Sequence, residues 1–176
     1  MSIVTLVGNP REGSRTLAVA GAAARAVGLR LSAVGSHDVV DLSALGPHLL
    51  SPGASPGVEV ALELVREADV LVVASPTYKG TYTGLLKAFL DRLPPDALAG
   101  KAALPLLVMG DAKHALAVEV HLRPLLVELG AFVPTPGLAV LESQLPQLDD
   151  VLSAWADRVA PQVAWRGEVA ARPSIV

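Results

Sequence analysis

The fold is decided by one stretch, Asp69-Val-Leu-Val-Val-Ala-Ser-Pro-Thr-Tyr-Lys-Gly-Thr-Tyr-Thr-Gly-Leu-Leu-Lys-Ala-Phe-Leu-Asp-Arg-Leu93. It begins with the short apolar, β-branched run Val70 to Ala74, which predicts a strand buried on both faces. A polar loop (residues 75–83) follows, and apolar residues then recur at helical spacing from Leu85 to Leu93. In this order, a strand, a polar loop and a helix present a ligand site at the carboxyl ends of an open parallel sheet.

The same alternation extends in both directions along the chain. Further strands are expected at Ile3–Val7, His37–Leu42, Ala102–Val108 and within 131–140, and helices at 17–29 (reaching Leu31 or Val34), Val58–Ala68, 115–129 and from Pro146 to about Val163. Crossovers of a dozen or more residues between strands indicate right-handed βαβ units and a parallel sheet. We therefore expect an α/β, flavodoxin-like three-layer sandwich with a five-stranded parallel sheet in the order 2-1-3-4-5.

Glycine and proline positions give the finer expectations. Gly35 is expected to end the first helix, and the segment 45–57, with its three prolines and three glycines, is expected to be a surface loop. Pro124 lies inside the helix expected at 115–129 and should kink it or break its hydrogen bonds. The inner face of that helix is expected to comprise Leu116, Val120, Leu122, Leu126 and Leu129.

Length and composition exclude several classes of protein. The 176 residues suit one domain, which we expect over 1–164, with a loose tail over 165–176. The chain has no cysteine, which excludes disulfides, thiolate catalysis and Cys-ligated metals. A net charge of −3 favours neither nucleic acid nor an anionic membrane. No window reaches the roughly 18 consecutive apolar residues that indicate a membrane helix. The chain enters its first strand with no basic region before it, so a cytoplasmic protein is expected.

Two polar loops are the richest segments of the chain. In the strand order 2-1-3-4-5 the switch point lies between strands 1 and 3, so loops 8–16 and 75–83 should lie side by side. The first loop delivers Ser14, Arg15 and Thr16 to the amino end of a helix, where free N–H groups, hydroxyls and a guanidinium favour a phosphate. Its spacing matches neither a dinucleotide-binding turn nor a P-loop, so a monophosphate fits better than a triphosphate. A capped helix after a turn is an equally good interpretation.

The second loop offers an aromatic edge at Tyr78, a cation at Lys79 and a close backbone approach at Gly80. A half-buried tyrosine beside a solvated lysine explains the same pattern about as well. Together, the two loops describe a pocket for a phosphorylated, flat, conjugated ligand. No hydrolytic triad is evident, and the histidines at 37, 48, 114 and 121 have no spacing typical of a metal site or a nucleophile.

Several segments between residues 3 and 130 carry a resemblance to a known family. They are Gly8-Asn-Pro-Arg with Ser14-Arg-Thr16, Ser75-Pro-Thr-Tyr-Lys79 with Tyr82-x-Gly84-x-x-Lys87, Leu98-x-Gly100-Lys101 with Leu104-Pro-Leu106, and His114-x-Leu116-Ala-Val118 with Leu122-Arg-Pro124-Leu125. The chain resembles the NADPH-dependent FMN reductase family of flavodoxin-like proteins. Within it, the chain is most similar to the reductase of two-component alkanesulfonate monooxygenase systems.

The resemblance implies a site and an activity. The implied cofactor-binding residues are Asn9, Ser14, Arg15 and Thr16 at the phosphate, Pro76, Thr77, Tyr78 and Lys79 along the flavin ring, and Gly110 with Asp111 at its pyrimidine side. We expect hydride transfer from the nicotinamide of NADPH or NADH to flavin N5, with no catalytic side-chain acid or base and with Lys79 steadying negative charge on the reduced flavin. Reduced FMN would then serve a monooxygenase. The resemblance, together with the high apolar content of 52%, implies a homodimer or homotetramer.

The sequence departs from the family at two places. Met109-Gly110-Asp111 replaces the usual Gly-Gly-Thr/Ser turn, and we expect Asp111 to point away from the flavin or to cap the next helix. The helix after it carries an aromatic residue in a π-bulge in the alkanesulfonate reductases, whereas this chain has Val120-His121. Either His121 takes that role, or the helix is regular and FMN stays bound.

Other functions of the same fold remain open from the sequence. The alternatives are an FMN-bound quinone, azo or metal-ion reductase, a non-catalytic flavodoxin-like electron carrier, and a scaffold that has lost its ligand. Steady NADPH consumption with free FMN distinguishes an FMN reductase from the electron carrier.

Overall fold

The computed structural model describes residues 1–31 and 35–171, with only the backbone described for 165–171. Its centre is a five-stranded sheet in the order β2-β1-β3-β4-β5, in which all neighbouring strands are parallel. The strands are β1 Ser2–Val7, β2 Ser36–Asp41, β3 Val70–Pro76, β4 Ala102–Met109 and β5 Leu138–Leu141. The predicted fold class and strand order are confirmed. The stretch that decided the fold forms the central strand, which extends two residues further than expected.

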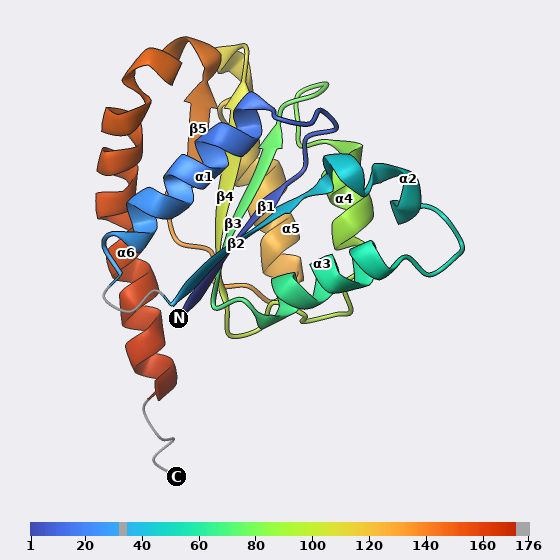
Figure 1. The fold of residues 1–176 in the computed structure, drawn as a ribbon. Helices are drawn as coiled ribbons and strands as arrows, with labels where there is room; N and C mark the ends of the chain where they lie inside the picture. Colours follow the sequence, from blue (N-terminus) through green and yellow to red (C-terminus); the bar gives the residue numbers. More distant parts are fainter. Residues whose placement is uncertain (32–34, 172–176) are drawn as a thin grey trace.

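Helices cover both faces of this sheet and complete the three layers. The α-helices are α1 Arg15–Gly28, α2 Gly46–Leu49, α3 Pro56–Glu67, α4 Gly84–Leu90, α5 Arg123–Glu128 and α6 Leu148–Ala171. Short 3-10 helices are η1 Leu42–Ala44, η2 Ala112–His114 and η4 Glu142–Gln147, and η3 Val118–Leu122 is a π-helix. Helices α1 and α6 lie on one face, and α3, α4 and α5 lie on the other (Figure 1).

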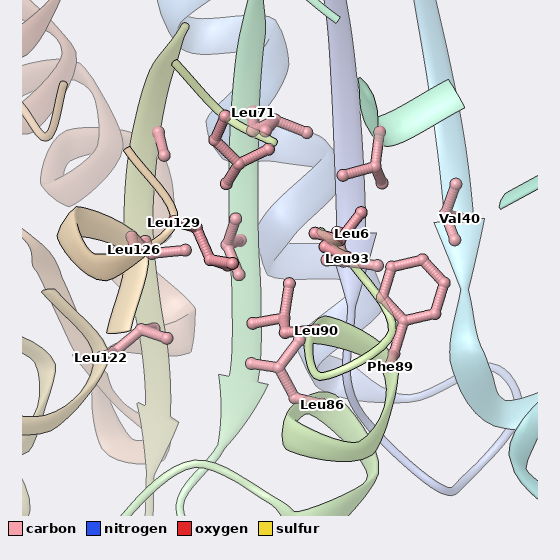
Figure 2. Close-up of a cluster of buried hydrophobic side chains, with 14 of the residues drawn as sticks. Leu6, Val40, Leu71, Leu86, Phe89, Leu90, Leu93, Leu122, Leu126 and Leu129 are labelled. Carbon is pink, nitrogen blue, oxygen red and sulfur yellow. The ribbon is translucent and has the colours of Figure 1, made fainter. Parts of the chain in front are cut away.

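Each face of the sheet has its own apolar core. Strand β3 is fully buried, and its side chains alternate between the two layers, as the two-residue period of a strand requires. Leu71 and Val73 pack toward α3–α5, whereas Val72 and Ala74 pack toward α1 and α6. Figure 2 shows the first of these layers, where Phe89 of α4 is completely buried. Coverage of both faces is the physical reason that the strands are continuous apolar runs.

The first helix, α1, starts at Arg15 and ends at Gly28, close to its predicted range of 17–29. Ser14 caps α1 by accepting a hydrogen bond from the Leu17 N–H at 3.2 Å. The helix ends at Gly28, so the predicted stop at Gly35 is wrong, and Val34 lies outside the described residues. Gly28 costs a helix about 1 kcal/mol relative to alanine, which explains why the helix ends there.

The helix expected at 115–129 is a composite. The π-helix η3 runs directly into α5, and Pro124 lies in the first turn of α5. The α-helical hydrogen-bond pattern is therefore interrupted next to this proline, as predicted. The predicted inner face is right at Leu122, Leu126 and Leu129. It is wrong at Leu116 and Val120, which are 66% and 49% exposed. The wider turn of a π-helix shifts the register, and Ala117 and Val118 are buried instead.

Two other boundaries differ from the expectation. The segment 45–57 contains the helix α2, with Pro47 in its first turn, so the prediction of an uninterrupted loop is wrong there. Helix α6 begins at Leu148 and continues to Ala171, beyond the expected end near Val163 and into the expected tail. Residues 172–176 of that tail lie outside the described residues.

A polar network joins the π-helix to the chain that leads into β5. Arg123 donates to the Val133 carbonyl at 2.5 Å and to the Pro134 carbonyl at 3.0 Å, and it also donates to the Glu119 carboxylate. Glu119 accepts a second bond from the Gly137 N–H at 2.6 Å. The Arg123 hydrogen bond, assisted by the Gly137 N–H, lowers the pKa of Glu119 from its ordinary value. The ionised carboxylate is therefore the form that stabilises this junction.

Replacing Glu119 with glutamine is expected to make stability less dependent on acid pH. A carboxyl group with a lowered folded-state pKa contributes stability above its unfolded-state pKa, and this stability is lost as the pH falls through the lowered value. The wild type should therefore exceed Glu119→Gln in free energy of unfolding at neutral pH, by about 1 kcal/mol because the pair is partly exposed. Urea denaturation from pH 7 downward measures the difference, with Glu128→Gln as a control. A difference that grows on acidification would contradict the assignment.

Candidate active site

The two polar loops meet at the carboxyl ends of β1 and β3. The Gly8 N–H donates to the Ala74 carbonyl at 2.8 Å, and the Thr83 hydroxyl donates to the Gly8 carbonyl at 2.6 Å. The Thr83 N–H donates to the Ser75 hydroxyl at 3.0 Å and closes the junction. The predicted adjacency of the loops is therefore confirmed. Gly8 is essential to it, because a Cβ at this position would lie 2.5 Å from Leu86 Cβ of α4.

A cleft of about 380 Å³ opens between the loops. This volume lies in the usual range for small-molecule sites. Six of the predicted site residues line it, namely Asn9, Ser14, Arg15, Thr16, Pro76 and Tyr78. The other predicted residues, Thr77, Lys79, Gly110 and Asp111, are not among its lining residues, and their roles stay predictions. Residues that the sequence reasoning did not assign also line the cleft: Arg11, Glu12, Gly13, Val108 and Glu142.

The part of the cleft at the first turn of α1 is polar, and two of its polar side chains, Asn9 and Thr16, are buried. Thr16 is 1% exposed, and its hydroxyl accepts a hydrogen bond from the Asn9 side-chain amide at 3.0 Å. Asn9 is fixed in turn, because its side-chain oxygen accepts from the Arg11 N–H at 2.9 Å. Since the Thr16 oxygen is already an acceptor, its proton is available to a ligand. With the N-terminus of α1 and the Ser14 hydroxyl, this arrangement suits an anion such as a monophosphate.

A carboxylate from a distant part of the chain also reaches this end. Arg15 Nη1 lies 2.9 Å from Glu142 Oε2, and Glu142 begins η4 directly after β5. The sequence reasoning missed Glu142. The available signal was an acidic residue at the carboxyl end of the fifth strand, the edge at which all the site loops gather.

Tyr78, which also lines the cleft, begins a tight turn. The Tyr78 N–H donates to the Thr81 carbonyl at 2.9 Å, and the Thr81 N–H donates back at 3.4 Å. The central residues Lys79 and Gly80 have φ angles of +55° and +84°, which indicates a type I′ turn. Positive φ is unusual for lysine and marks a candidate functional position. Tyr78 is 43% exposed, so its ring is available to a flat ligand.

The segment directly after β4 contains the first departure from the family pattern. The Asp111 carboxylate caps η2 by accepting from the Lys113 N–H at 3.0 Å, and it pairs with Lys113 Nζ at 2.8 Å. The Lys113 side-chain hydrogen bond, followed by that of the Lys113 N–H, lowers the pKa of Asp111. The expectation that Asp111 caps the next helix is confirmed. The negative charge of Asp111 is therefore paired with the Lys113 ammonium group.

The second departure is the helix that carries His121. It is not regular, because the π-helix η3 spans Val118–Leu122 and includes His121. The alternative of a regular helix is therefore wrong, although the π-turn contains no aromatic residue. π-turns often mark functional sites. A role for His121 in FMN handling stays a prediction.

Among the side chains of residues 1–31 and 35–164, no group of three or more His, Asp or Glu is placed to hold a metal ion. Over residues 1–31 and 35–171, no helix is both long and apolar enough to cross a bilayer.

An open parallel sheet with an anion-binding helix terminus between β1 and β3 defines a flavodoxin-like nucleotide-binding protein, the class in which FMN binds at this switch point. The chain belongs to a particular family of this class. Residues 1–145 match the family model of NADPH-dependent FMN reductases.

Known proteins similar to this chain agree with that family. An "FMN reductase (NADPH)" of Escherichia coli (strain K12) is 36% identical over 146 residues, which cover 82% of this chain and 75% of the relative. The "NADH-dependent FMN reductase SfnE" of Pseudomonas putida is 33% identical over 160 residues, covering 89% of this chain and 84% of the relative. A solved structure of an NADH:FMN oxidoreductase (EMOB) in its apo form aligns with a TM-score of 0.83 at 37% identity, covering 98% and 92% of the two chains.

The family resemblance drawn from the two loops is confirmed by these comparisons. So are the predictions of a flavin-dependent oxidoreductase and of FMN used with NADPH or NADH.

Proposed function

We propose that the protein reduces FMN with NADPH or NADH and releases reduced FMN to a flavin-dependent monooxygenase, as in alkanesulfonate systems. The observation that carries this proposal is the cleft between loops 8–16 and 75–83, which is lined both by the N-terminus of α1 with its polar side chains and by the exposed Tyr78. This arrangement suits a ligand with a monophosphate at one end and a flat ring at the other. Membership of the FMN reductase family supports the same ligand.

Each part of the site has a task in this proposal. Ser14, Arg15 and Thr16 hold the phosphate, and Asn9 fixes the Thr16 hydroxyl. Residues 76–79 contact the ring, and Gly110 with Asp111 borders it on the third side. Bound FMN supplies the hydride acceptor, and the protein orients the two rings and tunes the local charge.

The decisive experiment measures NADPH and NADH oxidation by the purified protein with free FMN. Steady turnover, with flavin that separates from the protein on gel filtration, is expected if FMN is a passing substrate. A protein that retains FMN and turns over only with a quinone, azo dye or metal ion would be a reductase of that alternative kind. Bound FMN without nicotinamide oxidation would indicate an electron carrier. Neither binding nor turnover would leave a scaffold that has lost its ligand and overturn the proposal.

Replacing Lys79 with asparagine is expected to lower kcat/KM for FMN reduction by roughly tenfold without destabilising the protein. Asparagine tolerates positive φ, so the type I′ turn should persist while the cation is lost. Initial rates and thermal melting measure the two effects. Lys101→Asn controls for a lost surface charge, because Lys101 precedes β4 and so lies at the amino ends of the strands, at the opposite edge of the sheet from the site. Wild-type kinetics in Lys79→Asn would show that the cation does not assist the reaction.

We also propose that the protein is a homodimer or homotetramer. Leu116 just before η3, Val120 within η3 and Val127 within α5 are 66%, 49% and 54% exposed. Burial of these side chains against another copy would explain an apolar content of 52%. Light scattering after gel filtration tests this; a monomer at all concentrations would contradict it.

The remaining proposals concern the domain and the cellular location. We take residues 1–164 as one FMN-binding domain and place the protein in the cytoplasm, where NADPH and the proposed partner would be available. Cell fractionation tests the location.

A further inference from the structure

The phosphate end of the cleft contains an ion pair that an anionic ligand must disturb. Arg15 Nη1 and Glu142 Oε2 are 2.9 Å apart, and both residues line the cleft. Their side chains are 62% and 41% exposed. Exposed ion pairs contribute little to stability, so this pair is poorly explained as a device that holds the fold together. Its position inside the proposed binding site is its distinguishing property.

We infer that Glu142 competes with the FMN phosphate for Arg15 and thereby keeps FMN affinity low enough for release; this inference rests on the proposed function. A phosphate is a strong acceptor for a guanidinium, and it would take the position at Arg15 that the carboxylate now occupies. Binding therefore exchanges one anionic partner of Arg15 for another. The net gain is smaller than at a guanidinium that has no carboxylate beside it.

The displaced carboxylate adds a second effect in the same direction. Glu142 reaches the cleft from η4, and its negative charge remains near the bound phosphate after Arg15 has changed partners. A phosphate at Arg15 and the nearby Glu142 carboxylate repel each other, and water at the open side of the cleft weakens this repulsion. Glu142 therefore acts on phosphorylated flavins and leaves the unphosphorylated ring system unaffected.

The cleft supplies a matched comparison within the same chain. Glu12 also lines it, but it has no ion pair with Arg15 or any other residue in the described part of the chain. Glu12→Gln and Glu142→Gln remove the same charge from the same cleft. Only the second replacement removes the competitor of Arg15.

The test measures equilibrium binding of FMN and of riboflavin, which lacks the phosphate, by flavin fluorescence. Glu142→Gln is expected to bind FMN about fivefold more tightly than the wild type, and riboflavin with unchanged affinity. Glu12→Gln should change FMN affinity by less than about twofold. Because Glu142 is exposed, Glu142→Gln should fold, and thermal melting checks this.

A double-mutant cycle with Arg15→Gln isolates the competition. Without the guanidinium, Glu142→Gln should tighten FMN binding by clearly less than it does in the wild-type background, because only the direct repulsion is left to remove. Weaker FMN binding in Glu142→Gln alone would show that the carboxylate orients Arg15, and unchanged binding would show that it does not compete; either result would overturn the inference. So would a tightening of the same size with and without Arg15, which would mean direct repulsion only. A wild-type protein that binds no FMN would overturn the proposed function itself, a result distinct from these.

Discussion

Replacing Thr83 with valine is expected to lower the free energy of unfolding by about 2–4 kcal/mol. Thr83 is 3% exposed, and its hydroxyl donates to the Gly8 carbonyl at 2.6 Å and accepts from the Leu86 N–H at 3.1 Å. Valine has nearly the same shape but makes neither bond. The replacement removes the N-cap of α4, worth about 1 kcal/mol, and leaves a buried carbonyl unpaired at a further cost of about 1–3 kcal/mol.

The same bond joins the two loops of the site, so Thr83→Val should also weaken FMN binding. Urea denaturation gives the stability, and fluorescence titration gives the affinity. Thr83→Ser is the control, because serine retains the hydroxyl and both of its partners. It should stay within about 1 kcal/mol of the wild type. If valine and serine were equally tolerated, the hydroxyl would not be the element that holds Gly8 beside α4.

The sequence predicted those parts of the fold that depend on a local physical constraint. Both faces of the sheet are covered, so each central strand had to be an unbroken apolar run, and Val70–Ala74 could be recognised without its partners. The strand order then implied that loops 8–16 and 75–83 meet, since a parallel sheet gathers the carboxyl ends of its strands at one edge. Ser14, Arg15, Thr16 and Tyr78 in the cleft follow from that topology and from the polar pattern of the two loops, whereas Asn9 and Pro76 follow only from the family resemblance.

What the sequence did not predict depends on contacts between distant segments. Glu142 reaches Arg15 only because β5 ends at the same edge of the sheet as β1, and no local pattern near residue 142 indicates a binding site. The π-helix is a second case. Gly137 brings the chain so close to Val118 that a Cβ there would lie 2.9 Å from Val118 Cγ2. The exposure of Leu116 and Val120 follows from the wider turn of the π-helix, which a regular helical period does not contain.

Replacing Gly8 with alanine is expected to destabilise the protein by about 3 kcal/mol or more and to weaken FMN binding strongly. The new Cβ would lie 2.5 Å from Leu86 Cβ and 3.2 Å from Leu86 Cα. Because one of these atoms is backbone, no side-chain rotation relieves the contact, and α4 must move away from the end of β1. That movement would stretch the bond from Thr83 to the Gly8 carbonyl, which holds the two loops together.

Gly84→Ala provides the matched control for this prediction. Gly84 is the first residue of α4, and a Cβ there would have nothing within 4 Å. Alanine should therefore be neutral or slightly stabilising at residue 84, because it also reduces the conformational freedom of the unfolded chain. Two identical replacements, close together in the site, should thus have opposite consequences. Equal stability of the two variants would mean that α4 can shift without cost, and that the close packing at Gly8 is not what fixes the geometry of the cleft.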